Sequence, residues 1–284
     1  MIAFQVIWAI GISMVMLGLM VLIRLPYKVI FILGVIIVAG HNLLDIPEAA
    51  TGFNASFAWD LFHHGVFTPY EFSPNRFAFL VYPFPAWTGV MMLGYCAGAL
   101  FTPTYTSEQR RKILTRIGLG LIVFFIALRF SNVYGDPVDW TTQKNGFYTF
   151  LSFLNVDKYP PSLLYLCITI GPALLLLAYM EKIKNSFTNA MVVFGRTAFF
   201  YYILHIYLIH LVAAICFFAR GHTLEDAQNV GKQFPFLFVA PGEGYNLWVV
   251  YGVWLAVVIA LYPLCKRYDK YKTIHKEKWW LSYL

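Results

Sequence analysis

Seven long apolar runs constrain the fold of this 284-residue chain more than any other feature. A helix of about 20 apolar residues is long enough to cross the hydrocarbon core of a bilayer. The runs are continuous, whereas the strands of a membrane β-barrel alternate apolar and polar residues. We therefore predict an all-α fold, a polytopic transmembrane helix bundle of about seven spans. The predicted spans are residues 2–23, 29–44, 77–101, 113–130, 162–180, 191–218 and 246–264.

Composition agrees with a membrane protein and argues against a nucleic-acid partner. Charged residues make up 12% of the chain, whereas a soluble domain usually carries about 25%. The net charge of +7 is concentrated beside the ends of the predicted helices. It is therefore better suited to anionic lipid headgroups than to nucleic acid. The four cysteines lie in or beside apolar runs, without metal-ligand spacing, and are interpreted as packing residues.

The loops between the runs alternate in charge, and this predicts an orientation. Of the 21 lysines and arginines, 15 fall in residues 24–28, 102–116, 181–196 and the tail from 265. Of the 14 acidic residues, 10 fall in residues 45–76, 131–161 and 219–245. Cytoplasmic loops retain Lys and Arg, so we predict a cytoplasmic C-terminus and an N-terminus outside. Because almost nothing precedes the first run, we expect further helices upstream.

Two domains are predicted. Residues 1–265 form the bundle, as the C-terminal part of a larger domain, and residues 266–284 form a basic, aromatic tail at the cytoplasmic interface. Within the bundle, Pro83 and Pro85 are expected to kink the third span because each lacks a backbone donor.

His41 and Asp45 are the candidate catalytic residues at the end of the second run. Residues four apart share one face of an α-helix, where a carboxylate can orient an imidazole as a general base. A simple polar helix end is the alternative interpretation. In the next outer loop, His63 and His64 follow Trp59 and Asp60. We interpret that segment as an amphipathic helix lying on the membrane, long enough to cover a cavity mouth.

Three residues near the predicted outer surface are candidate substrate ligands. Arg129 lies near the end of the fourth run, where it can pair with Asp45, Asp136 or Asp139, hold an anionic or sugar ligand, or extend to the headgroups. Lys158 and Tyr159 precede a double proline at the start of the fifth run and are placed in the same vestibule.

The sixth run contains two further candidate substrate-binding residues, His205 and His210, well inside apolar sequence. With Tyr201 on the face of His205, they suggest a polar interior path, although a buried histidine can equally bond a neighbouring helix. Arg196 begins this run on the predicted cytoplasmic side and is the candidate cofactor-binding residue, because guanidinium groups bind phosphates.

Four segments of the chain, in order, resemble bacterial members of the heparan-alpha-glucosaminide N-acetyltransferase-like membrane family. They are residues 39–45 (AGHNLLD), 82–95 (YPFPAWTGVMMLGY), 158–177 (KYPPSLLYLCITIGPALLLL) and 194–210 (FGRTAFFYYILHIYLIH). The resemblance runs in register to about residue 265. It implies a transmembrane acyltransferase whose acyl donor is acetyl-CoA, without a metal, and whose acceptor is a sugar or glycan across the membrane.

The family's catalytic histidine follows its first membrane span, a segment without a counterpart in this chain. Its role is therefore not carried over to His41, His205 or any other position, and we expect the chain alone to be inactive. We further predict that the protein lies in a bacterial inner membrane. Its expected partners are membrane lipids and further copies of itself in a homo-oligomer. The alternative is a transporter or export component for a glycan or lipid-linked sugar, in which intramembrane His and Arg would serve proton coupling or substrate passage.

Overall fold

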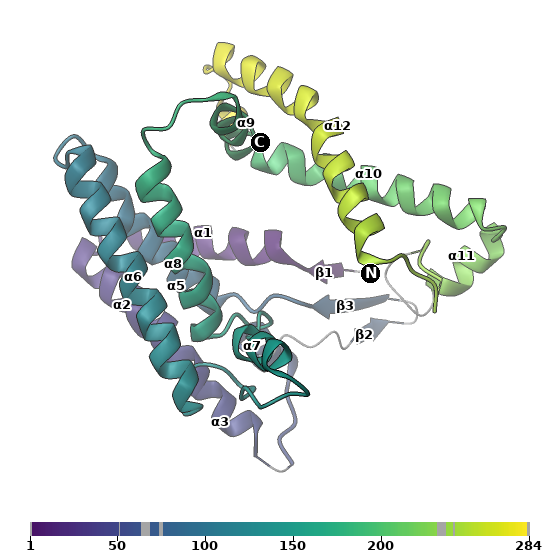
Figure 1. Cartoon of the computed structure of the whole chain (residues 1–284), viewed down its shortest axis with the longest axis horizontal. Coiled ribbons are helices and arrows are strands. Elements are labelled where there is room, and N and C mark those ends of the chain that lie inside the picture. Colours follow the sequence, from purple (N-terminus) through teal and green to yellow (C-terminus); the bar gives the residue numbers. More distant parts are fainter. Residues whose placement is uncertain are drawn as a thin grey trace. The chain divides into compact units, whose positions relative to one another are not determined.

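The computed structural model describes residues 2–50, 52–63, 69–73, 76–231, 237–240 and 242–282 of the chain (Figure 1). Contacts divide the chain into a first unit, Met1–Glu181, and a second unit, Lys182–Leu284. The boundary predicted at residue 265 falls inside a continuous helix, Leu247–Ile274, and the assignment of residues 266–284 as a separate tail stays a prediction.

The first unit is built around five main helices. In this unit, α1 and α2 pack against α5, and α6 packs along α8. Shorter helices and turns connect them. The main helices are α1 (Val6–Leu22), α2 (Tyr27–Gly40), α5 (Pro85–Ala97), α6 (Ser107–Ser131) and α8 (Leu163–Met180). The shorter helices are the 3-10 turn η1 (His41–Leu44), α3 (Asp45–Glu48), α4 (Phe57–Phe62), the 3-10 turn η2 (Gly98–Phe101) and α7 (Gly146–Leu154).

Five helical segments among the described residues are long and apolar enough to cross a membrane. They are Tyr27–Glu48, Ser107–Ser131, Leu163–Met180, Ala198–Ala219 and Leu247–Ile274, and Val6–Leu22 and Pro85–Phe101 are shorter apolar helices. Most side chains in these segments are not buried inside the protein. An apolar surface of this extent suits lipid as the surrounding medium. The chain is therefore an integral membrane protein, while the number of crossings and the orientation stay predictions.

The prediction of a helix over residues 77–101 is wrong at its start. A three-stranded sheet contains β3 (Arg76–Leu80), which runs parallel to β1 (Ile2–Phe4) and antiparallel to β2 (Pro69–Ser73) (Figure 1). The helix then begins at Pro85, a position where proline is tolerated because the first N–H groups of a helix have no intrahelical partner. Pro85 therefore starts the helix and does not kink it.

The second unit contains two long helices and several short ones. They are α9 (Ser186–Arg196), α10 (Ala198–Ala219), α11 (Leu224–Gly231), α12 (Leu247–Ile274) and the 3-10 turn η3 (Trp279–Ser282). Both α9 and α10 pack against α12. The predicted span 191–218 is divided at Thr197, whose buried hydroxyl donates to the carbonyl of Val193.

Helices α6 and α8 approach closely where glycine faces glycine. A Cβ atom built at Gly118 would lie 2.8 Å from the carbonyl oxygen of Gly171 and 3.0 Å from Leu175. One built at Gly171 would lie 2.9 Å from Ile122. Small residues at such positions let two helix backbones approach within a membrane protein.

Replacing Gly118 by Ala is therefore expected to lower the free energy of unfolding by about 1–3 kcal/mol, because the added methyl group overpacks a backbone contact. Thermal unfolding can be followed with a thiol-reactive fluorophore, since Cys96, Cys167 and Cys265 are free and buried. Gly120→Ala is the matched control on the same helix, because its Cβ would meet nothing within 4 Å. Equal unfolding temperatures for the two variants would contradict the close approach.

Candidate functional site

The candidate site lies in the first unit, where the turn after α2 docks against the start of α8. His41 and Asn42 are buried there. The Nε2 atom of His41 lies 2.8 Å from the carbonyl oxygen of Pro161, and the Oδ1 atom of Asn42 accepts the N–H of Leu163 at 2.8 Å. These bonds join segments about 120 residues apart in the sequence and fix the position of the residues that follow.

Asp45 pairs with His63, whereas the sequence predicted that it would pair with His41. Its Oδ1 atom lies 2.6 Å from Nε2 of His63, and its Oδ2 atom accepts a hydrogen bond from the amide of Asn42 at 2.7 Å. The predicted pair assumed an α-helix through residue 45. Residues 41–44 instead form a 3-10 turn with about 3 residues per turn, so positions four apart no longer share a face.

Both ring nitrogens of His41 face backbone oxygens. Nδ1 lies 3.0 Å from the carbonyl of Val38 and 3.2 Å from that of Ile37, while Nε2 faces Pro161. The His41 and His63 rings are neighbours, with centroids 6.3 Å apart. His41 therefore links the end of α2 to the segment before α8, and its ring packs beside the ring of His63.

His63 has one ring nitrogen engaged and one without a partner. The side chain is 1% exposed, and its Nδ1 atom forms no hydrogen bond with any described residue. When Nε2–H donates to Asp45, the Nδ1 lone pair is left as a proton acceptor. This is the arrangement of a general base oriented by a carboxylate. His64, which the sequence placed beside it, lies outside the described residues.

A second carboxylate, Glu48, borders the pair. Single ligand atoms of Asp45, Glu48 and His63 all lie within 4.8 Å of one another, and Glu48 accepts a hydrogen bond from the indole of Trp59. Such a set of donors is chemically suited to a divalent cation. Here Asp45 bonds His63 and Glu48 bonds Trp59, which favours acid–base chemistry as the first interpretation of the cluster.

Helix α4 carries His63 at its C-terminal end and is fixed at both ends. Ser56 caps its start by accepting the N–H of Trp59 at 3.2 Å. On its buried side, the hydroxyl of Tyr70 in β2 donates to Asp60. Burial and this carboxylate raise the pKa of Tyr70 to about 12, so the phenol keeps its proton at neutral pH. The segment predicted to lie on the membrane thus contacts strand β2 through its own buried Asp60.

Arg129 is 2% exposed and directs its guanidinium toward protein oxygens. It donates to four carbonyls, and its Nη1 atom lies 3.6 Å from Asp136. The sequence named Asp136 as one of three partners. The four carbonyls belong to Val138, Ser152, Phe153 and Asn155. This geometry favours a positioning role, and ligand binding by Arg129 stays a prediction.

Asp136 extends this network to the docking point of the site. It accepts hydrogen bonds from the Ser162 hydroxyl at 2.7 Å and from the N–H of Asp157 at 2.8 Å. Burial raises the pKa of Asp136, whereas those hydrogen bonds and Arg129 act in the opposite direction. The network therefore ends at residues 161–163, the same backbone that His41 and Asn42 contact.

Lys158 and Tyr159 lie just before this docking point. The Tyr82 hydroxyl donates to that of Tyr159 at 3.3 Å, and the Lys158 ammonium lies 5.1 Å from the centroid of the Tyr159 ring. Lys158 is exposed and Tyr159 is half-buried. Their assignment as substrate ligands stays a prediction.

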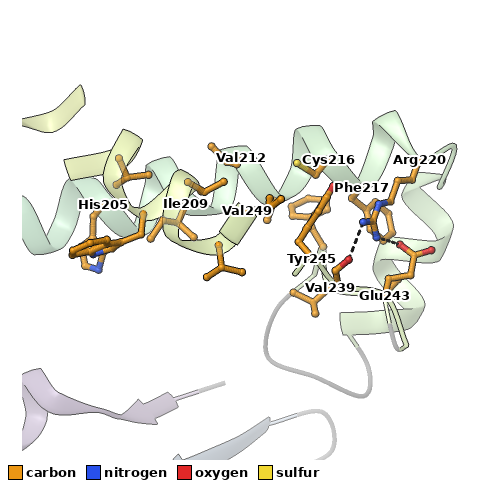
Figure 2. A pocket seen from close by; sticks show the side chains of 18 of the residues that line it. His205, Ile209, Val212, Cys216, Phe217, Arg220, Val239, Glu243, Tyr245 and Val249 are labelled. Atoms are coloured by element: carbon orange, nitrogen blue, oxygen red, sulfur yellow. Dashed lines mark hydrogen bonds and ion pairs between the residues drawn. The ribbon is translucent and has the colours of Figure 1, made fainter. Parts of the chain in front are cut away.

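The other predicted site residues belong to the second unit. His205 lines a cavity of about 730 Å³ between α10 and α12, and its Nδ1 atom lies 3.2 Å from the carbonyl of Tyr201 (Figure 2). The ring of His210 packs on Phe238, with centroids 5.3 Å apart.

Arg196, at the end of α9, is half-exposed and already has protein partners. Its Nε atom lies 3.0 Å from Asp269, and its Nη2 atom donates to Thr273 at 2.8 Å. Both partners are on α12, and Lys272 of the same helix donates to the Arg196 carbonyl. Arg196 therefore links α9 to α12, and phosphate binding is an additional role that stays a prediction.

Arg129→Lys is expected to lower the free energy of unfolding by about 3 kcal/mol or more, because one ammonium cannot reach the four buried carbonyls and Asp136. Thiol-reactive thermal unfolding measures the effect. Arg111→Lys, at an exposed position of the same helix, is the control that retains wild-type stability. A variant at residue 129 as stable as the control would show that the network does not hold the site.

A family model agrees with part of the predicted resemblance. Residues 1–130 match the family described as heparan-alpha-glucosaminide N-acetyltransferase, catalytic. The match includes segments 39–45 and 82–95, whereas segments 158–177 and 194–210 lie beyond it. No curated protein and no solved structure gives a significant match to the chain. The match over residues 1–130 supports a heparan-alpha-glucosaminide N-acetyltransferase-like family member, with a membrane acyltransferase-like function.

Proposed function

We propose that this protein transfers an acetyl group from acetyl-CoA to a sugar amine or hydroxyl, with Asp45 and His63 as its acid–base pair. The observation that carries the proposal is the 2.6 Å contact between Asp45 and His63, which leaves Nδ1 of the imidazole without a partner among the described residues. The family match over residues 1–130 supports acyl transfer as the reaction class.

The proposed chemistry uses the contacts of Asp45 with His63 and with Asn42. The acceptor N–H or O–H gives its proton to Nδ1 of His63 while its heteroatom attacks the thioester carbonyl. The carbon–sulfur bond then breaks, and the CoA thiolate leaves and takes up a proton. Asp45 holds Nε2–H and stabilises the imidazolium that forms, and Asn42 fixes the second oxygen of Asp45.

The predicted orientation supports an acetyl-CoA site on the side of the membrane opposite to the Asp45–His63 pair. Positive-inside charge predicts that Arg196 and the basic residues of the tail are cytoplasmic and that the loop 45–76 is outside. The CoA phosphates would bind at the cytoplasmic side near Arg196. The pantetheine arm would then carry the acetyl group toward the acceptor, and holding the two reactants together lowers the entropic cost of the reaction.

His63→Ala is expected to reduce acetyl transfer by about 100-fold or more, because the acceptor loses its base. The measurement is transfer of labelled acetyl from acetyl-CoA to glucosamine-terminated glycans by the whole protein reconstituted in liposomes. Added imidazole should restore part of the activity by occupying the vacated space.

His41→Ala is the matched control for this experiment. It removes the link to Pro161 and is expected to lower stability, without rescue by imidazole. Rescue of the His41 variant, with no rescue at position 63, would return the catalytic role to the predicted pair His41 and Asp45. Full activity in both variants would remove the acid–base proposal.

Two substitutions distinguish CoA binding by Arg196 from its structural ion pair with Asp269. Arg196→Ala is expected to weaken CoA binding and to make the remaining affinity less sensitive to salt, since one phosphate contact is lost. Asp269→Asn breaks the same ion pair but frees the guanidinium, so CoA affinity should hold or rise. Calorimetric titration with CoA measures both, and equal loss in the two variants would assign Arg196 to helix packing alone.

A further inference from the structure

The cavity of the second unit has long apolar walls and one polar end (Figure 2). Figure 2 shows His205 and Ile209 toward one end of the row of lining side chains and Arg220 with Glu243 at the other. Val212 and Val249 lie between them on α10 and α12. A volume of about 730 Å³ falls within the range of ligand pockets, about 300–1,000 Å³. Its shape and polarity are those of a site for an amphiphile.

The polar end contains hydrogen-bond donors and acceptors, and the charge of Arg220 is balanced by that of Glu243. Nη1 of Arg220 lies 2.7 Å from Glu243, and Nη2 donates to the carbonyl of Gly244 at 3.2 Å. The other oxygen of Glu243 lies 3.0 Å from Nε2 of His222. The guanidinium of Arg220 stands 4.3 Å from the centroid of the Tyr245 ring.

This end is better suited to a sugar than to a phosphate. A phosphate would have to displace Glu243 from Arg220, and the carboxylate would repel it. Hydroxyl groups both donate and accept, so they can bond Glu243 and Arg220 while the ion pair stays intact. The half-exposed ring of Tyr245 offers an apolar surface beside them.

The apolar part of the cavity is open to a chain from the bilayer. Few of the residues of α10 and α12 are buried inside the protein, and large side chains such as Trp254 remain exposed. In a membrane these helix faces meet lipid tails, so an acyl chain can reach Val212, Val249 and Val253 without crossing water.

We propose that this cavity binds a glycolipid, with its hydrocarbon chain along α10 and α12 and its sugar headgroup at Arg220, Glu243 and Tyr245. The predicted orientation puts the loops 219–245 and 45–76 on the same side of the membrane. Glycolipids as a class are then the proposed acceptors for acetyl transfer. That last assignment rests on the proposed function, whereas glycolipid binding does not.

The test uses the whole protein in nanodiscs of unlabelled phosphatidylcholine, without acetyl-CoA. One probe is a glucosyl glycerolipid with a diazirine at the end of its acyl chain, and the other is a phosphocholine glycerolipid with the same chain. After irradiation, mass spectrometry measures labelling of Ala198–Ala219 and Leu247–Ile274. The glucosyl probe is expected to label these segments about tenfold more strongly, a preference of the size that hydrogen bonds to charged groups provide.

Three variants test whether labelling depends on the cavity. Their unfolding temperatures are measured to show that each variant is folded. Glu243→Ala should remove the preference for the glucosyl probe. Ala213→Trp fills the cavity and should reduce labelling by both probes, while Ile215→Trp, on an exposed face of the same helix, should leave it unchanged. Equal labelling by the two probes, insensitive to residue 243, would show bulk lipid only and overturn the proposal.

Absence of labelling on both helices would also overturn it, because it would mean that another part of the chain or a second copy covers the cavity. Selective labelling without any acetyl transfer would instead contradict the proposed function and leave glycolipid binding intact. The two proposals therefore fail by different measurements.

Discussion

The buried guanidinium of Arg129 is the interaction on which the arrangement of the first unit depends. A charge in the membrane region is costly unless protein groups replace its hydration. Arg129 meets this condition through four carbonyls from the connection between α6 and α8, together with Asp136. Folding that connection around one side chain brings its end, residues 161–163, to the turn after α2. The same region is also held by an apolar cluster, in which Val38 packs against Phe125, Leu163 and Leu164.

From that point, polar contacts follow one another to the proposed base. Asp136 bonds Ser162, the backbone at Leu163 bonds Asn42, and Asn42 bonds Asp45. Asp45 then bonds His63. Each member of such a chain orients the next, and a buried network is rigid only when its members are satisfied. Within this network, Nδ1 of His63 has no partner among the described residues, and this calls for a functional explanation.

The sequence predicted which polar residues lie in this site better than it predicted their hydrogen-bond partners. Charge and hydropathy patterns predict the membrane helices, and Asp136 is among the partners expected for Arg129. The partner of Asp45 was not predictable from helix spacing, because the 3-10 turn at 41–44 gives no clear signal in the sequence. The pair with His63 also joins positions 18 residues apart across an irregular loop. Residues 77–80 were assigned to a helix because an apolar strand and an apolar helix start look alike at this length.

The two neighbouring histidines show why contact geometry, more than residue type, decides which one is suited to catalysis. Both lie in one polar cluster, with ring centroids 6.3 Å apart. His41 has carbonyl oxygens against both nitrogens, so an acceptor would have to break a contact between segments to reach it. His63 has a carboxylate against one nitrogen, and its second nitrogen has no partner in the described parts of the chain. A proton can therefore move to and from His63 without disturbing the bond that orients its ring, and this is the property that a general base requires.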